Sequence, residues 1–219
     1  MFNIICVKFG NKYSSDFVNK LYMDFLSYNP LNPFKFHCYT DDPEGIHDSI
    51  NIVNPVGPTL KGVWNKLALF SEEFPIKGKN IYLDLDVCIQ GDIIEMLEND
   101  NHDWNRLHLV YTPWKDNKKR YGRLSSYDVV HHSSVMIWES NVHDIWEHFN
   151  SGLRDYFMRK YVGIDRFLAH EDIEVKYLPE HMTVSKKYEN RLNKYYRPIP
   201  VIATYEELDV QISDLLPCN

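Results

Sequence analysis

Two carboxylates, Asp84 and Asp86, stand one residue apart in the segment NIYLDLDVCIQGDI (80–93), directly after a short apolar run. In an extended strand, side chains two positions apart point to the same face, so both carboxylates are expected on one face and Leu85 on the other. Two like charges about 7 Å apart repel each other unless a positive charge lies beside them. The pair therefore favours a hard divalent cation, Mn²⁺ or Mg²⁺, which keeps its other positions for water and a substrate phosphate.

The residues after the pair support a ligand site. Gly91 and Asp92 predict a turn into a helix with Asp92 as its N-cap. The carboxylates then lie at the carboxyl end of a buried strand, which is where open α/β sheets bind ligands. A purely structural role is the alternative, because an N-cap and a solvated strand edge also place acidic residues at such a position.

The elements that must position the pair alternate along the first part of the chain. Strands are expected at 3–9, 34–40 and 80–86, and helices at 14–28, at 62–74 and directly after Asp92. This β-α-β-α-β-α order predicts a doubly wound α/β fold with a mainly parallel central sheet, right-handed crossovers and helices on both faces.

The second part of the chain continues with shorter elements. Strands are expected at 107–112, 133–138, 173–179 and 200–204, and helices after the N-cap Asn141, at 163–170 and after a capping box of Thr204 and Glu207. A basic polar loop is expected at 186–194. No Pro/Gly/Ser-rich linker and no internal repeat interrupts this order, so residues 1–219 are expected to form a single domain.

Composition excludes several classes of protein. A hydrophobic content of 44%, a charged content of 25% and a net charge of −7 indicate a globular chain that does not bind nucleic acid. No apolar run approaches the roughly 20 residues that a membrane helix needs, and no signal peptide is evident at Met1. Four cysteines without CxxC spacing are expected to be reduced, as in a cytoplasmic protein: Cys6, Cys38, Cys88 and Cys218.

Two further sequence features bear on ligands. The aromatic content of 14% predicts either a large aromatic core or faces on which sugars or bases stack. After the first expected strand, neither GxGxxG nor GxxxxGK[ST] is present, which excludes a dinucleotide fingerprint and a P-loop. If a nucleotide binds, a metal rather than a glycine cradle must manage its phosphates.

The segment YLDLDVCIQGDI resembles the DXD signature of GT-A fold (Rossmann-like) nucleotide-sugar glycosyltransferases, of the small bacterial and phage type distantly similar to the glycogenin-like families. VKFGNKYSSDFVNKLY, FHCYTDD, WNKLALF, SSVMIWE and GIDRF resemble that group's segments in the same order, over about residues 3–185. The resemblance implies a hexosyltransferase that uses Mn²⁺ (or Mg²⁺) and a UDP-sugar to glycosylate a hydroxyl of a glycan or other acceptor. A nucleotide-binding half would span about 1–100, and a donor-sugar and acceptor half about 101–219.

The resemblance also implies roles for individual residues. Asp86 would bind the metal directly, and Asp84 would share it or hold the ribose and bound waters. Lys66 would meet the diphosphate or the donor sugar. Asp165, the second expected catalytic residue beside Asp86, would hydrogen-bond the donor sugar or act as the general base. The expected nucleotide- and donor-binding positions are Val7, Lys8, Phe9, Gly10, Tyr13, Thr40, Asp41 (the last two at the base), Lys66, Asp84, Leu85, Ser133 and Ser134.

The chain departs from the group's pattern at three places. His131 and His132 stand where relatives often have asparagine, and GIDRF lacks the group's glutamine. The C-terminal histidine motif that supplies another metal ligand in relatives is replaced by PVIATYEELDV. Either His181 or water and phosphate oxygens would then complete the metal's coordination, and the basic loop at 186–194 would cover the diphosphate.

Two other functional classes compete with this interpretation. Haloacid-dehalogenase-like phosphatases also place an Asp-x-Asp triplet at a strand end, but near the start of the chain rather than after two β-α units. A non-catalytic nucleotide-sugar-binding module is the second alternative, because the C-terminal motif is missing. These residues leave open whether transfer retains or inverts the sugar's configuration.

Overall fold

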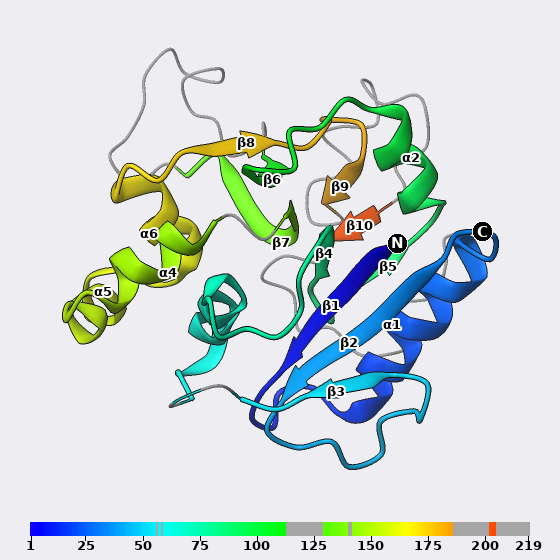
Figure 1. Ribbon diagram of the computed structural model, residues 1–219, viewed down its shortest axis with the longest axis horizontal. Helices are drawn as coiled ribbons and strands as arrows, with labels where there is room; N and C mark the ends of the chain where they lie inside the picture. The colour runs from blue at the N-terminus through cyan, green and yellow to red at the C-terminus, as the bar shows by residue number, and fades with distance from the viewer. Residues whose placement is uncertain (56, 58, 113–128, 140–141, 186–201, 205–219) are drawn as a thin grey trace.

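A computed structural model describes residues 1–219 except 56, 58, 113–128, 140–141, 186–201 and 205–219, and it is built around a seven-stranded sheet with the order β3-β2-β1-β4-β7-β6-β8 (Figure 1). The strands are β1 (Phe2–Lys8), β2 (Phe34–Thr40), β3 (Asn51–Val53), β4 (Asn80–Leu83), β6 (Leu107–Tyr111), β7 (His131–Trp138) and β8 (Val175–Tyr177). The first four pair in parallel, and so do β6 and β8. Only β7 is antiparallel to its neighbours, β4 and β6. The expected mainly parallel sheet is confirmed.

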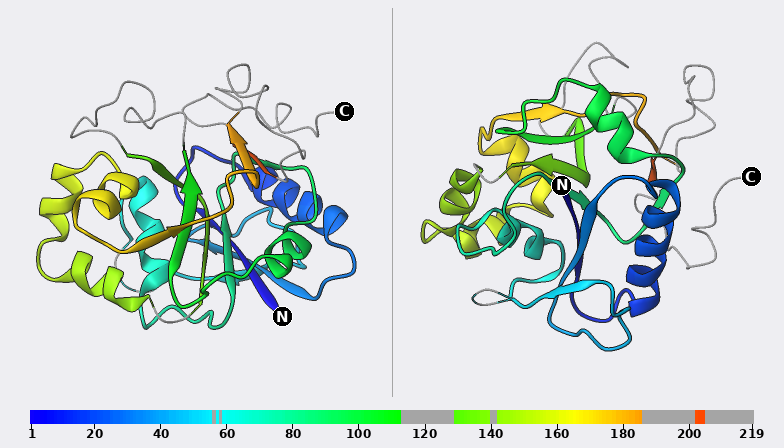
Figure 2. Two further views of the ribbon diagram at one scale, coloured as in Figure 1. Left: turned by 90° about the horizontal axis from the view of Figure 1, so that it is seen from above. Right: turned by 45° about the vertical axis from the view of Figure 1, so that its right-hand side comes forward.

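Helices cover both faces of this sheet, as expected (Figure 2). They are α1 (Ser15–Tyr28), the 3₁₀ helix η1 (Gly62–Phe70), α2 (Ile93–Asn99), α4 (His143–Asn150), α5 (Arg154–Lys160) and α6 (Ile164–His170). One hydrophobic cluster contains residues of α1 and α2, and a second contains residues of η1, α4, α5 and α6. Side chains of β4 point alternately into the two clusters, because Ile81 and Leu83 belong to the first cluster and Tyr82 belongs to the second.

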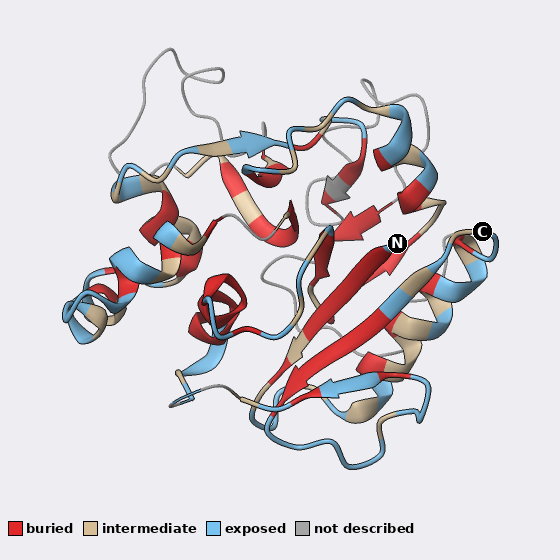
Figure 3. Cartoon of the chain, viewed as in Figure 1, coloured by how far each residue is buried: buried red, intermediate tan, exposed pale blue. Residues whose placement is uncertain are grey.

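The core explains most of the aromatic content. The central strands are buried along most of their length and so is η1, whereas the α-helices expose their outer sides (Figure 3). Trp64 of η1 stacks on Phe149 of α4 at 5.5 Å, and Phe157 and Phe167 pack beside them at 5.1 Å from each other. Cys6, Cys38 and Cys88 are buried free thiols, as expected, while Cys218 lies outside the described residues.

One asparagine and one aspartate side chain fix the ends of α1 and α2, the two helices that pack in the first hydrophobic cluster. Asn29 is fully buried: its amide donates to the carbonyl of Phe25 at 2.9 Å, and its Oδ1 accepts the N–H of Ile94 at 3.1 Å. The Asn29 side chain therefore caps the C-terminus of α1 and accepts a free backbone N–H in the first turn of α2. Asp92 is the N-cap of α2 and accepts the N–H of Glu95 at 2.8 Å, which confirms the expected cap.

A second, three-stranded sheet consists of β5 (Val87–Ile89), β10 (Ile202–Thr204) and β9 (Thr183–Ser185), with β10 in the middle. Of these, only the strand at 200–204 was expected from the sequence. Thr204 pairs with Val87, so residues near the end of the chain lie directly beside the residue that follows Asp86.

Some expectations about individual elements are wrong or lie outside the described residues. The helix expected at 62–74 is the shorter η1, whose residues from Trp64 to Phe70 are all buried, so packing rather than an amphipathic pattern determines it. The cap expected at Asn141 is wrong, because α4 begins at His143 and Val142 occupies its N-cap position without a side-chain hydrogen bond. The loop expected at 186–194 and the helix expected after Thr204 fall in regions that the structure does not describe. Within the described residues, no helix is both long and apolar enough to cross a membrane.

Candidate functional site

The carboxylate pair lies on a turn rather than on a continuous strand. β4 ends at Leu83, although the N–H of Asp84 still donates to the carbonyl of Ser134 in β7 at 2.8 Å. Leu85 and Asp86 then form a turn in which the N–H of Val87 bonds the carbonyl of Asp84 at 3.4 Å. The strand expected through Asp86 is wrong, because the chain leaves the main sheet here to enter β5. Leu85 is buried in the core, so only its backbone could contact a ligand.

Asp84 is held by a buried lysine. Nζ of Lys66 lies 2.7 Å from Oδ1 and 2.9 Å from Oδ2 of Asp84, and 3.3 Å from the carbonyl of Ser133. The hydroxyl of Tyr82 also donates to Asp84. Burial, followed by the charge of Asp84, raises the pKa of Tyr82 well above its ordinary value, so this phenol remains a donor. Lys66 therefore links the carboxyl end of β4 to the start of β7, rather than lying in solvent on the surface of its helix.

Asp86 is half-buried and accepts a 2.7 Å hydrogen bond at Oδ2 from the hydroxyl of Tyr13. Burial and then the charge of Asp84 raise the pKa of Asp86, and the hydrogen bond from Tyr13 and the charge of Lys66 only partly oppose this. A carboxylate whose negative charge is disfavoured in this way gains stability when a cation approaches. The donor set of two neighbouring carboxylates thus fits a hard divalent cation.

Asp165 stands in the first turn of α6 and contacts the start of β7. Its Oδ1 accepts the N–H of Ser133 at 3.0 Å, and its Oδ2 lies 3.7 Å from Nε2 of His132. Nε2 of His131 lies 2.9 Å from the backbone carbonyl of Asp165. Burial alone would raise the pKa of Asp165, but the charges of His132 and Lys66 and the hydrogen bond from Ser133 lower it overall. Asp165 is therefore ionised, and Ser133 connects it to Lys66 and Asp84.

The ends of β1 and β2 are braced against each other. The buried Lys8 donates to Oδ2 of Asp42 at 2.9 Å and to the carbonyl of Asp42 at 3.1 Å. Oγ1 of Thr40 bonds the backbone of Asp42 at 3.1 Å, whereas Asp41 is exposed. The hydrogen bond from Lys8 lowers the pKa of the Asp42 carboxyl. Sequence reasoning missed Asp42, although the expected parallel pairing of these strands could have placed it near Lys8.

The other expected positions differ in accessibility. Val7 and Phe9 are partly exposed, and Gly10 turns the chain after β1 with φ at +69°, a conformation that favours glycine. Oγ of Ser134 is buried and forms no hydrogen bond in the described part of the chain. His181 is exposed.

The described residues contain no group of three or more His, Cys, Asp or Glu side chains arranged to hold a metal ion. Neither His181 nor another side chain of these types therefore completes a three-residue metal site with Asp84 and Asp86 within the described ranges.

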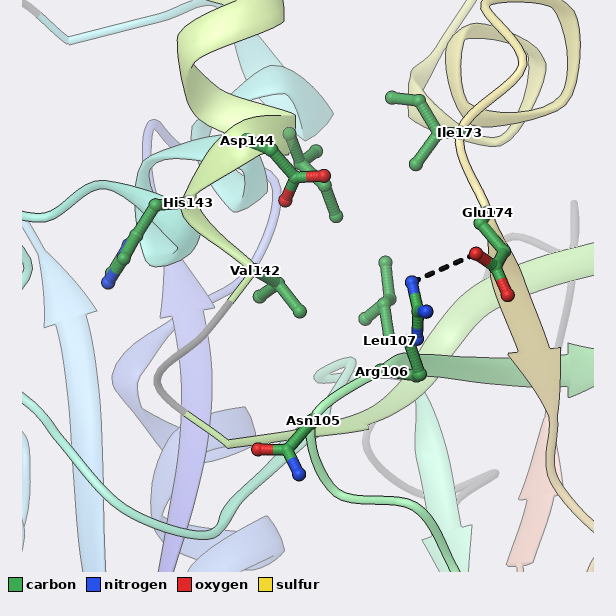
Figure 4. Close-up of a pocket in the computed structure, with 9 residues that line it drawn as sticks. Asn105, Arg106, Leu107, Val142, His143, Asp144, Ile173 and Glu174 are labelled. Atoms are coloured by element: carbon green, nitrogen blue, oxygen red, sulfur yellow. Dashed lines mark ion pairs between the residues drawn. The ribbon is translucent and has the colours of Figure 1, made fainter.

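Two hollows lie away from this cluster. One, of about 160 Å³, lies between the start of β6, the start of α4 and β8, and contains an ion pair of Arg106 and Glu174 at 2.9 Å (Figure 4). The other, of about 310 Å³, lies between α4 and the residues that follow η1. β6 runs in the same direction as β4, since both are antiparallel to β7, so the first hollow lies at the opposite end of the sheet from Asp84.

Comparisons with known proteins define the fold. No family model matches the chain, and no curated protein matches it in sequence. Its structure is similar to that of the galactosyltransferase LgtC in complex with donor and acceptor sugar analogues, with a TM-score of 0.65 and 14% identity over 93% of this chain and 86% of that one. It is also similar to a glycosyltransferase involved in glycosylation of the major capsid of PBCV-1 (TM-score 0.57, 12% identity, 98% and 96% of the two chains).

A third similar structure is mouse xyloside xylosyltransferase 1, with a TM-score of 0.54 and 11% identity over 94% of this chain and 98% of that one. The chain therefore has the GT-A fold of glycosyltransferases, as its sequence segments indicated.

Proposed function

We propose that the protein is a metal-dependent glycosyltransferase that moves a sugar from a UDP-sugar to the hydroxyl of an acceptor. The supporting observation is the cluster of Asp84, Asp86, Lys66 and Asp165 at the carboxyl end of β4, in a chain with a glycosyltransferase fold. This is the edge of an α/β sheet at which ligands bind. The structures of LgtC include donor and acceptor sugar analogues, which supports the same classes of ligand here. The choice of UDP rests on the sequence resemblance.

Asp84 and Asp86 would hold the cation, Mn²⁺ or Mg²⁺, because they are the neighbouring carboxylates at this edge and the charge of Asp86 is disfavoured without one. When bound, such a cation offsets the negative charge on the diphosphate leaving group. Water and phosphate oxygens are proposed to complete its coordination, since His181 is exposed and no three-residue metal group exists among the described residues.

The chain's own side chains would position the donor. The Lys66 ammonium is buried beside Asp84, so its field acts at low dielectric, and it would interact with a diphosphate placed at this edge. The ionised Asp165 would accept a hydrogen bond from a sugar hydroxyl. Thr40, Asp41 and residues 7–10 would line the pocket for the nucleotide base. Thr40 and Lys8 both bond Asp42 and so hold the residues after β2 in place, which leaves the exposed Asp41 side chain accessible to the base.

The test is a turnover measurement. Purified protein is incubated with a panel of UDP-sugars and Mn²⁺, with and without excess chelator, and the release of UDP is measured. The proposal predicts metal-dependent UDP release from at least one donor. Full activity in excess chelator would contradict metal dependence. UDP binding without release from any donor would favour a non-catalytic binding module, and phosphate release from a phosphomonoester without nucleotide would favour a phosphatase.

A further inference from the structure

The larger of the two hollows, of about 310 Å³, is lined by one side of α4. His143, Trp146, Glu147 and Asn150 follow the i, i+3, i+4, i+7 spacing that places side chains on one side of a helix, and all four line the hollow. Nδ1 of His143 lies 2.8 Å from the carbonyl oxygen of Phe70 at the end of η1. A carbonyl only accepts, so the proton of the neutral ring is on Nδ1 and Nε2 is an acceptor.

Trp146 gives this hollow one flat apolar surface. Its ring packs against the buried Phe149 at 5.9 Å, and Cζ of Arg154 lies 5.6 Å from the centre of the ring. The side chain is half-buried, so part of the indole remains accessible from the hollow. Because its neighbours already hold the indole in place, a ligand that packs on it orders little else.

The charged groups around the hollow are not paired with one another. The exposed carboxylates of Glu72 and Glu73, which follow η1, and of Glu147 line it together with Arg154. None of these four side chains forms an ion pair with a residue that the structure describes.

Arg154 has an unmet hydrogen bond at this position. Its Nη2 donates to Oδ1 of Asn150, whereas its Nε is buried and has no hydrogen-bond partner in the described part of the chain. A buried N–H without a partner is unfavourable, so an oxygen atom brought by a ligand would stabilise this arrangement.

The lining restricts the chemistry of a ligand. No group of three or more metal-binding side chains exists among the described residues, which disfavours a metal ion. Three carboxylates against one guanidinium disfavour a phosphate or another acid. Donors and acceptors around one apolar surface suit a molecule with several hydroxyls, each of which both donates and accepts, and with an apolar ring face.

We propose that this hollow binds one uncharged pyranose residue of a glycan, packed on Trp146 and hydrogen-bonded by Glu147, Asn150 and Arg154. Its volume lies at the small end of the range for ligand pockets, about 300–1,000 Å³, which fits a single sugar better than a nucleotide.

The position of the hollow makes it a second site. His143 lines this hollow as well as the smaller one (Figure 4), which lies at the opposite end of the sheet from Asp84. The bound sugar is therefore not the donor of the proposed transfer reaction. The inference does not depend on that reaction, so a binding measurement tests it.

The experiment follows the indole N–H signals of the five tryptophans by ¹H–¹⁵N NMR, with the Trp146 signal assigned from Trp146→Phe. The probes are the methyl glycosides of glucose, galactose, xylose and N-acetylglucosamine, and the methyl glycosides of glucuronate and galacturonate. At least one uncharged glycoside should shift the Trp146 signal with a Kd on the order of 1 mM, as expected for a ligand of this size. The uronates should bind at least about 10-fold more weakly, because the carboxylates repel them. Saturating UDP and Mn²⁺ should leave the Kd unchanged.

Exposed residues supply variants that do not disturb the core. Glu147→Ala should weaken binding of the glycoside by about 5–10-fold, because a hydrogen bond to a charged group is lost. Glu98→Ala, which removes an exposed carboxylate from α2, is the matched control and should leave the Kd unchanged.

Three results would overturn the inference: no uncharged glycoside shifts the Trp146 signal, the uronates bind as tightly as the uncharged sugars, or Glu147→Ala and Glu98→Ala behave alike. A lysine-rich peptide that shifts the signal where no glycoside does would assign the hollow to a basic protein segment instead. If a glycoside binds but UDP is released from no donor, the proposed function fails and the sugar site stands.

Discussion

Two ion pairs of nearly equal length lie at opposite ends of the central sheet. At the carboxyl end of β4, Nζ of Lys66 lies 2.7 Å from Asp84, and the two side chains are 9% and 18% exposed. At the other end, Arg106 lies 2.9 Å from Glu174, and the two side chains are 48% and 58% exposed. Distance alone does not distinguish the pairs, whereas burial does.

Burial changes what an ion pair costs and what it can do. An exposed pair gains little because water and salt screen it. A buried pair pays for desolvation, and hydrophobic residues of similar size often stabilise a fold as well or better. The Lys66–Asp84 pair is thus poorly explained by stability, and a role in binding a charged ligand accounts for it better. The Arg106–Glu174 pair needs no such role.

The largest expected effect is the loss of Asp86. Asp86→Ala should lower the rate of sugar transfer by roughly 10²–10⁴, about 3–5 kcal/mol, because one of the two proposed oxygen ligands is removed. The measurement is the rate of UDP release at saturating Mn²⁺. Asp144→Ala, which removes an exposed carboxylate beside the opposite hollow (Figure 4), is the control and should retain the full rate. A rate near wild type in Asp86→Ala would remove Asp86 from the site.

Lys66 should affect both activity and stability. Lys66→Met is expected to lower the transfer rate by about 10²–10³, because the buried cation near the diphosphate is lost. It should also lower the free energy of unfolding by about 1–3 kcal/mol, because Asp84 loses a partner. Lys66→Arg keeps the charge and should lose less of both. Urea unfolding and steady-state kinetics measure the two effects, and an unchanged rate in Lys66→Met would leave the buried pair without a catalytic explanation.

His37 sharpens the comparison, since it is an ionisable group within the sheet rather than at either end. It is buried on β2, and neither ring nitrogen has a hydrogen-bond partner in the described part of the chain. Burial, with a smaller contribution from the charge of Lys35, lowers the pKa of His37 from 6.5 to about 4. The unfolded chain therefore binds the proton more readily, and the stability that His37 contributes above pH 6.5 is lost as the pH falls toward 4.

This loss amounts to about 3 kcal/mol of unfolding free energy. Urea unfolding at pH 7 and pH 4.5 measures it. In His37→Leu the difference between the two pH values should shrink by most of that amount, and an unchanged difference would mean that His37 is not the group responsible.

The smallest effect is expected at the exposed pair. Arg106→Ala should change the free energy of unfolding by no more than about 0.5 kcal/mol and should leave UDP release unchanged. The same urea and kinetic measurements apply. A loss comparable to that of Lys66→Met would show that exposure does not separate the two pairs.

Local patterns predicted much of the fold. The alternation of apolar strands with helical spacing placed β1, α1, β2 and β4, and the Gly-Asp turn placed the cap of α2 at Asp92. Short strands such as β5 and β9 were not predicted, because a segment of three residues shows no hydrophobic periodicity. The turn at Leu85 and Asp86 was not predicted for a related reason. A segment in which apolar and polar residues alternate is typical of a strand, and only its pairing partners show where the strand ends.

The candidate site was predicted by residue type but not by contact. Spacing and resemblance proposed Asp84, Asp86, Lys66 and Asp165 as site residues, and their role stays a prediction, although the structure places them near one another. Their contacts join residues far apart in sequence, such as Lys66 with Asp84 and Ser133 with Asp165, and no local rule supplies such pairings. The pairing of His132 with Asp165 depends on how α6 packs against β7, which only the tertiary structure determines.

The most direct test of the central claim is whether nucleotide and metal stabilise the protein together. Thermal unfolding is measured with UDP alone, Mn²⁺ alone and both, for the wild-type chain and Asp86→Ala. UDP with Mn²⁺ at about 100 times the Kd is expected to add roughly 2.7 kcal/mol to the free energy of unfolding, UDP in excess chelator is expected to add far less, and Asp86→Ala is expected to lose the difference. Equal stabilisation by UDP with and without chelator, or none in either condition, would contradict the central claim.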